Sequence, residues 1–167
     1  MADETAVAPP ARGAVALLAS LLAHAGGAAL LATALLTSAS VLKRWATNQP
    51  VPGDFELVSL GSGLAVAGFL AYGTLLRTNI LVDTFTTWMP KRLARGVDAF
   101  WTLVWAGVAA VLAERLFVGA TETLRTGTTT MVLGLPTWWA VGLAALGFGA
   151  TALAALYWVV RLMGGRD

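Results

Sequence analysis

Few residues of this chain have the types and spacing that chemistry requires. There is no cysteine, which excludes a catalytic thiol, a zinc site built on thiolates and an iron–sulfur cluster. There is a single histidine, His24, so a haem held between two histidines is excluded as well. No acid, base and nucleophile stand together in a pattern that predicts an active site. We therefore expect no catalytic, cofactor or metal site, and we do not expect the protein to be an enzyme.

His24 lies inside a long uncharged stretch. A charge is costly in hydrocarbon, so an ionisable residue in such a place is a functional candidate. Its neighbours at a spacing of four residues are Ser20, Ala28 and Ala32. This row of small residues predicts close contact with a neighbouring helix, to which a neutral imidazole can form one hydrogen bond. We expect a packing role for His24, and a functional site is the alternative.

Two carboxylates, Asp54 and Glu56, stand just before the second uncharged stretch. A carboxylate there interacts favourably with the positive end of a helix, and Asp54 is of a type that can serve as the N-cap. For Glu56 we weigh helix capping against a salt bridge to a partner subunit. The first stretch contains no acid, unlike the first span of small proton-coupled exporters, whose carboxylate must bind proton and cation in turn.

The remaining charged residues border or interrupt the apolar stretches. Arg77 and Asp83 follow the second stretch, and we expect them to anchor it at the membrane surface, with a subunit contact as the alternative. Glu114 and Arg115 interrupt the third stretch. We expect these two side chains to reach the lipid headgroups or each other.

The scarcity of charge is a property of the whole chain. Of its 167 residues, 57% are hydrophobic and 12% are charged, and the mean hydropathy is +0.74. These values lie outside the range of an ordinary soluble domain and indicate an integral membrane protein. The basic residues are dispersed among apolar stretches rather than gathered in a patch, so we expect no nucleic acid as a partner.

Four stretches are long enough to cross a bilayer as helices, which takes about 20 apolar residues. After a tail over 1–12 that we expect to be disordered, the predicted spans cover 13–42, 57–76, 98–119 and 138–160. The predicted fold class is an all-α membrane protein with four transmembrane helices in a single membrane domain. Between the second and third spans, a short amphipathic helix in the interface plane is predicted by helical spacing of the apolar residues Leu81, Phe85 and Trp88.

The second span carries an unbroken row of small residues at a spacing of four. Small residues allow two helix backbones to approach closely, which drives helix association in membranes. We expect this row to pack against a larger partner subunit, and packing against the chain's own spans is the alternative. The row consists of Ser59, Gly63, Ala67 and Ala71.

The basic residues are shared unevenly between the two sides that four spans define, with seven on the side of the termini and four opposite. The positive-inside rule then makes the side of the termini cytoplasmic. Tryptophans at membrane interfaces agree with this orientation, because Trp138 and Trp139 fall at the outer surface. The two sets are Arg12, Arg77, Lys91, Arg92, Arg95, Arg161 and Arg166, and Lys43, Arg44, Arg115 and Arg125.

Two motifs, in their order and spacing on four spans, resemble the small membrane subunit of TRAP transporters, the DctQ-like family. The closing motif is the stretch 133–139, with Pro136 before Trp138 and Trp139. The first motif flanks the second span and consists of Arg44, Asn48, Pro50, Pro52, Glu56 and Leu57, then Arg77, Asn79, Ile80, Val82 and Asp83. The chain departs from the family pattern at Asn79, where histidine is frequent, and at Phe55, where a second acid is frequent.

The resemblance implies a non-catalytic subunit of a sodium-driven importer of organic anions such as carboxylates, in the bacterial inner membrane. Its partners would be a large DctM-like membrane subunit, a periplasmic DctP-like binding protein and membrane phospholipids. A self-contained four-helix transporter or exporter, acting as a homo-oligomer, is the alternative. For a transporter subunit of this family, the candidates for subunit contacts or a scaffold role are Arg44, Glu56, Ser59, Gly63, Ala67, Ala71, Arg77, Asp83, Trp138 and Trp139.

Overall fold

A computed structural model describes residues 14–76 and 90–163. These ranges fold into four α-helices, each long and apolar enough to cross a membrane, which confirms the predicted all-helical class. Their bounds are α1 Ala14–Thr47, α2 Asp54–Leu75, α3 Lys91–Thr126 and α4 Trp138–Met163. The expected interfacial helix, the tail, Arg77 and Asp83 lie outside the described residues.

All four helices extend beyond at least one end of the spans that hydropathy predicted, and α1 and α3 do so by the most. α1 continues past residue 42 through Lys43 and Arg44, and α3 continues past residue 119 to Thr126. Charged residues end an apolar stretch but do not break a helix, whose limits depend on caps and backbone geometry. α3 follows Pro90 and ends at Gly127, whose φ of +65° is the left-handed conformation typical of a helix C-terminus.

The start of α2 differs from the prediction that Asp54 is its N-cap. Gly53 occupies the N-cap position, with φ +73°, and Asp54 is the first helical residue. A side chain at Gly53 would collide with Leu133 from the distant connector between α3 and α4. Glycine is required here for both reasons, because it accepts positive φ and leaves room for Leu133.

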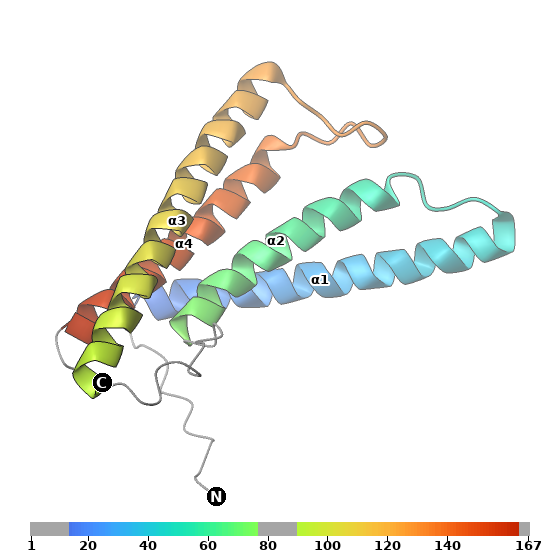
Figure 1. The fold of residues 1–167 in the computed structure, drawn as a ribbon. Coiled ribbons are helices and arrows are strands. Elements are labelled where there is room, and N and C mark those ends of the chain that lie inside the picture. Colours follow the sequence, from blue (N-terminus) through green and yellow to red (C-terminus); the bar gives the residue numbers. More distant parts are fainter. Residues whose placement is uncertain (1–13, 77–89, 164–167) are drawn as a thin grey trace, which may run out of the picture.

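The four helices form two hairpins that diverge from a common end (Figure 1). α1 packs against α2, α3 packs against α4, and α2 and α4 join the two hairpins. We call the end where α2 and α4 finish the closed end, and the end that carries the connectors 48–53 and 127–137 the open end. Toward the closed end, α4 also contacts α1, whereas the backbone of α3 packs against α4 alone among the described helices.

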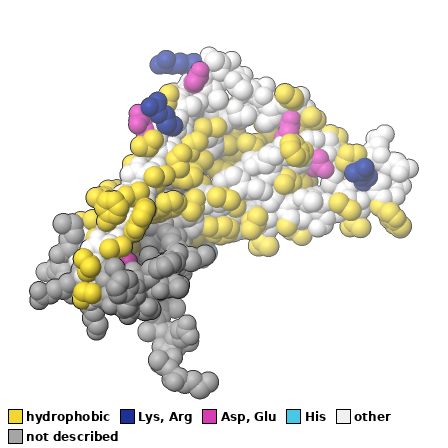
Figure 2. Space-filling model, in the orientation of Figure 1, with side chains coloured by type: hydrophobic (Ala, Val, Ile, Leu, Met, Phe, Trp, Pro, Cys, Tyr) yellow, Lys and Arg dark blue, Asp and Glu magenta, His cyan; other side chains and the backbone are white. Residues whose placement is uncertain are grey.

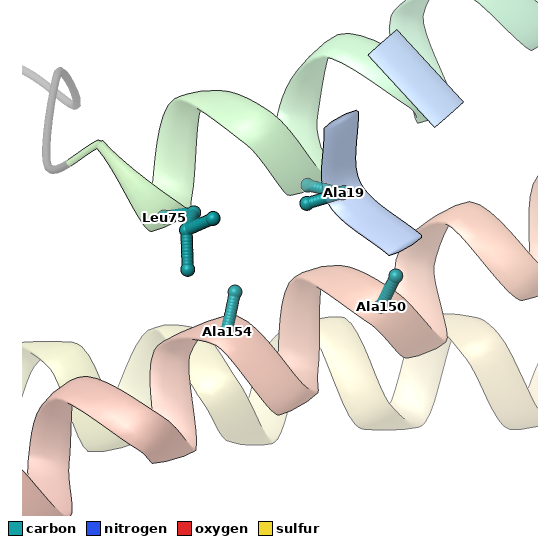
Figure 3. Packing of buried hydrophobic residues seen from close by; sticks show 5 residues of the cluster. Ala19, Leu75, Ala150 and Ala154 are labelled. Atoms are coloured by element: carbon teal, nitrogen blue, oxygen red, sulfur yellow. The ribbon is translucent and has the colours of Figure 1, made fainter. Parts of the chain in front are cut away.

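The core at the closed end is built from small side chains of three helices. It contains Ala19 of α1, Ala71 and Leu75 of α2, and Ala150 and Ala154 of α4 (Figure 3). Large apolar side chains, such as Leu31 and Leu35 of α1, are instead exposed. This distribution suits a bilayer, where the hydrophobic effect does not drive helices together and close backbone contact does.

Backbone approach is closest at two glycines. A Cβ on Gly147 of α4 would lie 2.8 Å from the carbonyl oxygen of Ala67 in α2. A Cβ on Gly68 would collide with the carbonyl group of Leu22 in α1. Two consecutive residues of α2, Ala67 and Gly68, therefore contact α4 and α1 respectively.

Two tryptophans tie the helices near the closed end. The indole nitrogen Nε1 of Trp158 in α4 donates to the carbonyl oxygen of Leu75 at 2.8 Å. The Nε1 of Trp105 in α3 donates to the hydroxyl of Thr74 at 3.2 Å, which links α3 to α2. The guanidinium of Arg161 lies 5.0 Å from the centroid of a Trp158 ring, within the range of a cation–π interaction.

Candidate functional site

The first connector of the open end is folded back onto α1 by Ser40, a buried polar residue. The Ser40 hydroxyl donates a short hydrogen bond to the Asp54 carboxylate and accepts one from the backbone nitrogen of Val51 at 3.1 Å. The ammonium of Lys43 donates to the carbonyl oxygen of Pro50 at 3.3 Å. Asp54 thus joins the start of α2 to the last turns of α1 rather than capping α2.

Glu56 joins the two hairpins across the open end. Its Oε1 accepts a hydrogen bond of 2.7 Å from the backbone nitrogen of Val132. Its Oε2 accepts one of 3.1 Å from the backbone nitrogen of Leu133. The carboxylate therefore binds two consecutive amides of the α3–α4 connector, a pairing stronger than bonds between neutral groups. We call this arrangement the Glu56 latch.

The connector that Glu56 holds has a defined conformation of its own. The backbone nitrogen of Thr130 donates to the carbonyl oxygen of Leu135 at 2.9 Å, and that of Gly134 donates to the carbonyl of Thr130 at 3.2 Å. Thr129 and Pro136 form an isolated antiparallel bridge. These bonds close a compact turn whose tip presents the amides of residues 132 and 133 to the latch.

The position of Glu56 in α2 favours its ionised form. It lies in the first turn, where the positive end of the helix stabilises a carboxylate. The sequence suggested capping of its own helix or a salt bridge to a partner. Within the described chain, its hydrogen bonds go to amides 76 and 77 residues further on, and a salt bridge to a partner subunit stays a prediction. No local pattern in the sequence pointed to Val132 and Leu133 as its partners.

Several large side chains are exposed at the open end, in addition to the latch. Met131 and Val132 at the tip of the connector, Trp45 at the end of α1 and Phe55 at the start of α2 are all exposed. Trp138 and Trp139 begin α4 and are partly exposed as well. Arg44, in the last turn of α1, is exposed as well. The Glu56 latch and these side chains make up the candidate docking surface.

The row of small residues in α2 is divided by the fold. Ala67 and Ala71 are buried, Ala67 against Gly147 of α4 and Ala71 within the core at the closed end. Ser59 and Gly63 are exposed, and a Cβ on Gly63 would meet no atom within 4 Å. The deeper half of the row thus packs against the chain's own helix, and the other half stays open to a partner.

Within the described part of the chain, His24 forms no hydrogen bond to another helix, and its packing against a helix of a partner subunit stays a prediction. Its imidazole is exposed, and its Nδ1 lies 2.7 Å from the carbonyl oxygen of Ser20, one turn earlier in α1. Ala28 and Ala32 are exposed as well. Three of the four residues of the row thus face outward, because the buried face of α1, which includes Ala19, Gly26 and Thr33, lies elsewhere on the helix.

Comparison with known proteins identifies a family for this architecture. The family model for Tripartite ATP-independent periplasmic transporters, DctQ component, matches residues 33–165. No curated protein and no solved structure gives a match. The matched range contains α2, α3 and α4 entirely, together with the open end and its latch. The chain therefore belongs to the DctQ family and is a small membrane component of a TRAP transporter.

Proposed function

We propose that this protein is a fixed, non-catalytic scaffold for the large DctM-like subunit and that it helps to dock the periplasmic DctP-like binding protein. The complex would sit in the bacterial inner membrane and take up organic anions, such as carboxylates, at the expense of a sodium gradient. Family membership supports the tripartite assembly. The distribution of basic residues supports cytoplasmic termini, which would place the open end in the periplasm.

The observation that carries the scaffold role is the Glu56 latch. If the two hairpins were joined only at the closed end, their other ends could move apart and together. Here Glu56 ties α2 to the α3–α4 connector, and Trp158 and Trp105 tie the helices near the closed end. A subunit held at both ends is suited to support a moving partner without moving itself.

The latch also supports the docking role. It holds the turn 127–137 in one conformation, so a binding protein that contacts Met131 and Val132 would not have to order the loop first. Avoiding that cost in conformational entropy favours association. Trp138, Trp139 and Arg44 would frame the same surface, where aromatic residues and arginine are frequent contacts in protein interfaces.

The sides of the helices would divide between protein and phospholipid. Ser59 and Gly63 offer an open row of small residues to the large subunit. The leucines exposed along α1 suit phospholipid chains. Arg77 and Asp83 would anchor the chain at the cytoplasmic surface or contact another subunit there.

Reconstitution tests the proposal. The small subunit, the large subunit and the loaded binding protein are placed in proteoliposomes with an inward sodium gradient, and uptake of a labelled carboxylate is measured. We expect uptake with all three components and none when either membrane subunit is omitted. Transport by the small subunit alone would contradict the proposal and favour the self-contained transporter.

Docking is tested by shortening the exposed tip. Met131→Ala should raise the KM for the loaded binding protein, with little change in the maximal rate or in the amount of membrane complex. Leu124→Ala is a matched control, because Leu124 is also a large exposed side chain but lies in the last turns of α3, before the connector begins. An unchanged KM in the Met131 variant would exclude the tip from docking.

A further inference from the structure

We infer that the outer face of α3, at Glu114 and Arg115, contacts a transmembrane helix of the large subunit that supplies polar groups to both side chains. The inference rests on the proposed function, because it names the surface through which the scaffold would hold its partner. It concerns a helix on which the sequence suggested no interface. Three properties of the pair support this contact: its direction, its depth and its lack of partners among the described residues.

The pair points away from this chain's own bundle. The buried residues of α3 are Ala106, Ala109 and Ala120, which lie on the face that packs against α4. Glu114 and Arg115 are exposed. Charged side chains lie over α3, next to apolar ones, on the side of the molecule drawn in Figure 2.

The depth of the pair follows from the antiparallel packing of α3 on α4. Gly119 lies against Val141, and Ala120 lies against Gly142. Five or six residues earlier in α3, Glu114 is therefore level with residues 146–148 of α4. The distance along α4 from Trp138, at the start of the helix, to this level is about nine residues, or about 14 Å.

The same level lies in the middle of the bundle. Gly147 contacts Ala67 there, and Ala67 is near the centre of α2. Glu114 and Arg115 consequently stand well inside the apolar part of the helices. At this depth, the pair would face a neighbouring helix rather than the lipid headgroups that the sequence suggested.

Within the described part of the chain, neither side chain forms an ion pair or hydrogen bond that would offset its charge. An unpaired charge facing hydrocarbon is costly, and charged residues at such depths almost always face protein or water. The exposed side of α1 gives a contrast, because no residue from Ala14 to Leu42 is charged. The face of α1 therefore suits lipid, and the face of α3 suits polypeptide.

The occupant that fits is a helix of the large subunit with an acceptor for Arg115 and a donor for Glu114. The family is the DctQ component of tripartite transporters, so a larger membrane component is the expected neighbour. Gly107 is exposed on α3, and a Cβ there would meet no atom within 4 Å, which leaves room for close approach. A second copy of this chain and a lipid environment are the competing occupants that the experiment distinguishes.

The direction of a substitution effect separates protein from lipid. Glu114→Leu and Arg115→Leu would relieve an unfavourable exposure if the pair faced lipid, and recovery of the large subunit would be unchanged or higher. If the pair faces the partner helix, recovery should fall about three- to tenfold, the range expected for an interhelical polar contact. Glu122→Leu, which removes an exposed acid near the end of α3, is the control and should have little effect.

The measurement is co-purification of the large subunit in mild detergent, normalised to the inserted small subunit. A photo-crosslinking residue at Val111 or Val118, both exposed on α3, gives a second readout without changing the charges. It should form an adduct with the large subunit, whereas the same residue at Leu31 on α1 should not. This readout decides the question if the leucine variants fail to insert.

Several results would overturn the inference. These are wild-type recovery with both leucine variants, adducts from Leu31 alone, or adducts that join two copies of this chain. If the unmodified chain recovers no large subunit at all, the proposed function fails as well. If it recovers the large subunit and only the α3 substitutions have no effect, the proposed function stands and this surface is wrong.

Discussion

Glu56 and Val132 are 76 residues apart in the chain, and the carboxylate Oε1 of one lies 2.7 Å from the backbone nitrogen of the other. The second oxygen of Glu56 binds the next amide, that of Leu133. Through this contact, the first turn of one hairpin fixes the connector of the other. The shape of the open end therefore depends on one side chain.

We expect Glu56→Gln to loosen the connector. A glutamine has one acceptor oxygen and no charge, so it can satisfy only one of the two amides and forms a weaker bond. Amide hydrogen exchange at Val132 and Leu133 should become several-fold faster, while exchange in the middle of α4 is unchanged. Glu122→Gln is the control, and equal protection in the two variants would contradict the latch.

Two glycines of α2 should respond in opposite ways to the same change. Gly68→Ala should destabilise the protein by about 1–3 kcal/mol, the usual cost of overpacking, because the new methyl group collides with the Leu22 carbonyl. Gly63→Ala meets open space and should stabilise the helix by about 0.5–1 kcal/mol. Thermal unfolding in detergent measures both, and equal melting temperatures would contradict the packing of α1 on α2.

Larger substitutions in the row of small residues should separate folding from assembly. Ala67→Leu should lower the amount of the small subunit itself, because Ala67 packs against Gly147. Gly63→Leu should insert and fold normally but should weaken recovery of the large subunit, because its side chain would hold the partner backbone away. Leu64→Ala and Leu70→Ala are controls. Wild-type recovery with Gly63→Leu would remove Gly63 from the proposed interface.

His24→Gln should leave transport by the complete system nearly unchanged. The imidazole Nδ1 interacts with the carbonyl of its own helix at Ser20, so among the described residues it forms no hydrogen bond to a second helix. Sodium-driven uptake, normalised to the amount of complex, is the measurement. Normal assembly with abolished uptake would reveal a functional site that the geometry does not account for.

Topology can be tested independently of the partners. The excess of basic residues on the side of the termini predicts that both lie in the cytoplasm. A phosphatase that is active only in the periplasm should be silent when fused after Asp167, and the same enzyme inserted after Gly127, in the connector of the open end, should be active. The reverse pattern would invert the proposed orientation and move docking to the closed end.

The sequence by itself determined the four apolar helices and pointed to the family. These features depend on residues that are neighbours in the chain. An apolar stretch of sufficient length forms a helix in a bilayer because its backbone must be satisfied internally. Gly127 fixes a helix end by its local backbone geometry. Such signals can be read without knowing how the helices pack.

The tertiary structure alone decided which residues meet. Glu56 was singled out by its position before a span, but its partners Val132 and Leu133 depend on how the second hairpin lies against the first. The same packing buried Ala67 and Ala71, left Ser59 and Gly63 exposed, and turned His24 outward. In a membrane, almost every face of an apolar helix has similar hydropathy, so the face that becomes buried cannot be predicted from composition. Close fit between backbones makes that choice, and the fit exists only once the helices are assembled.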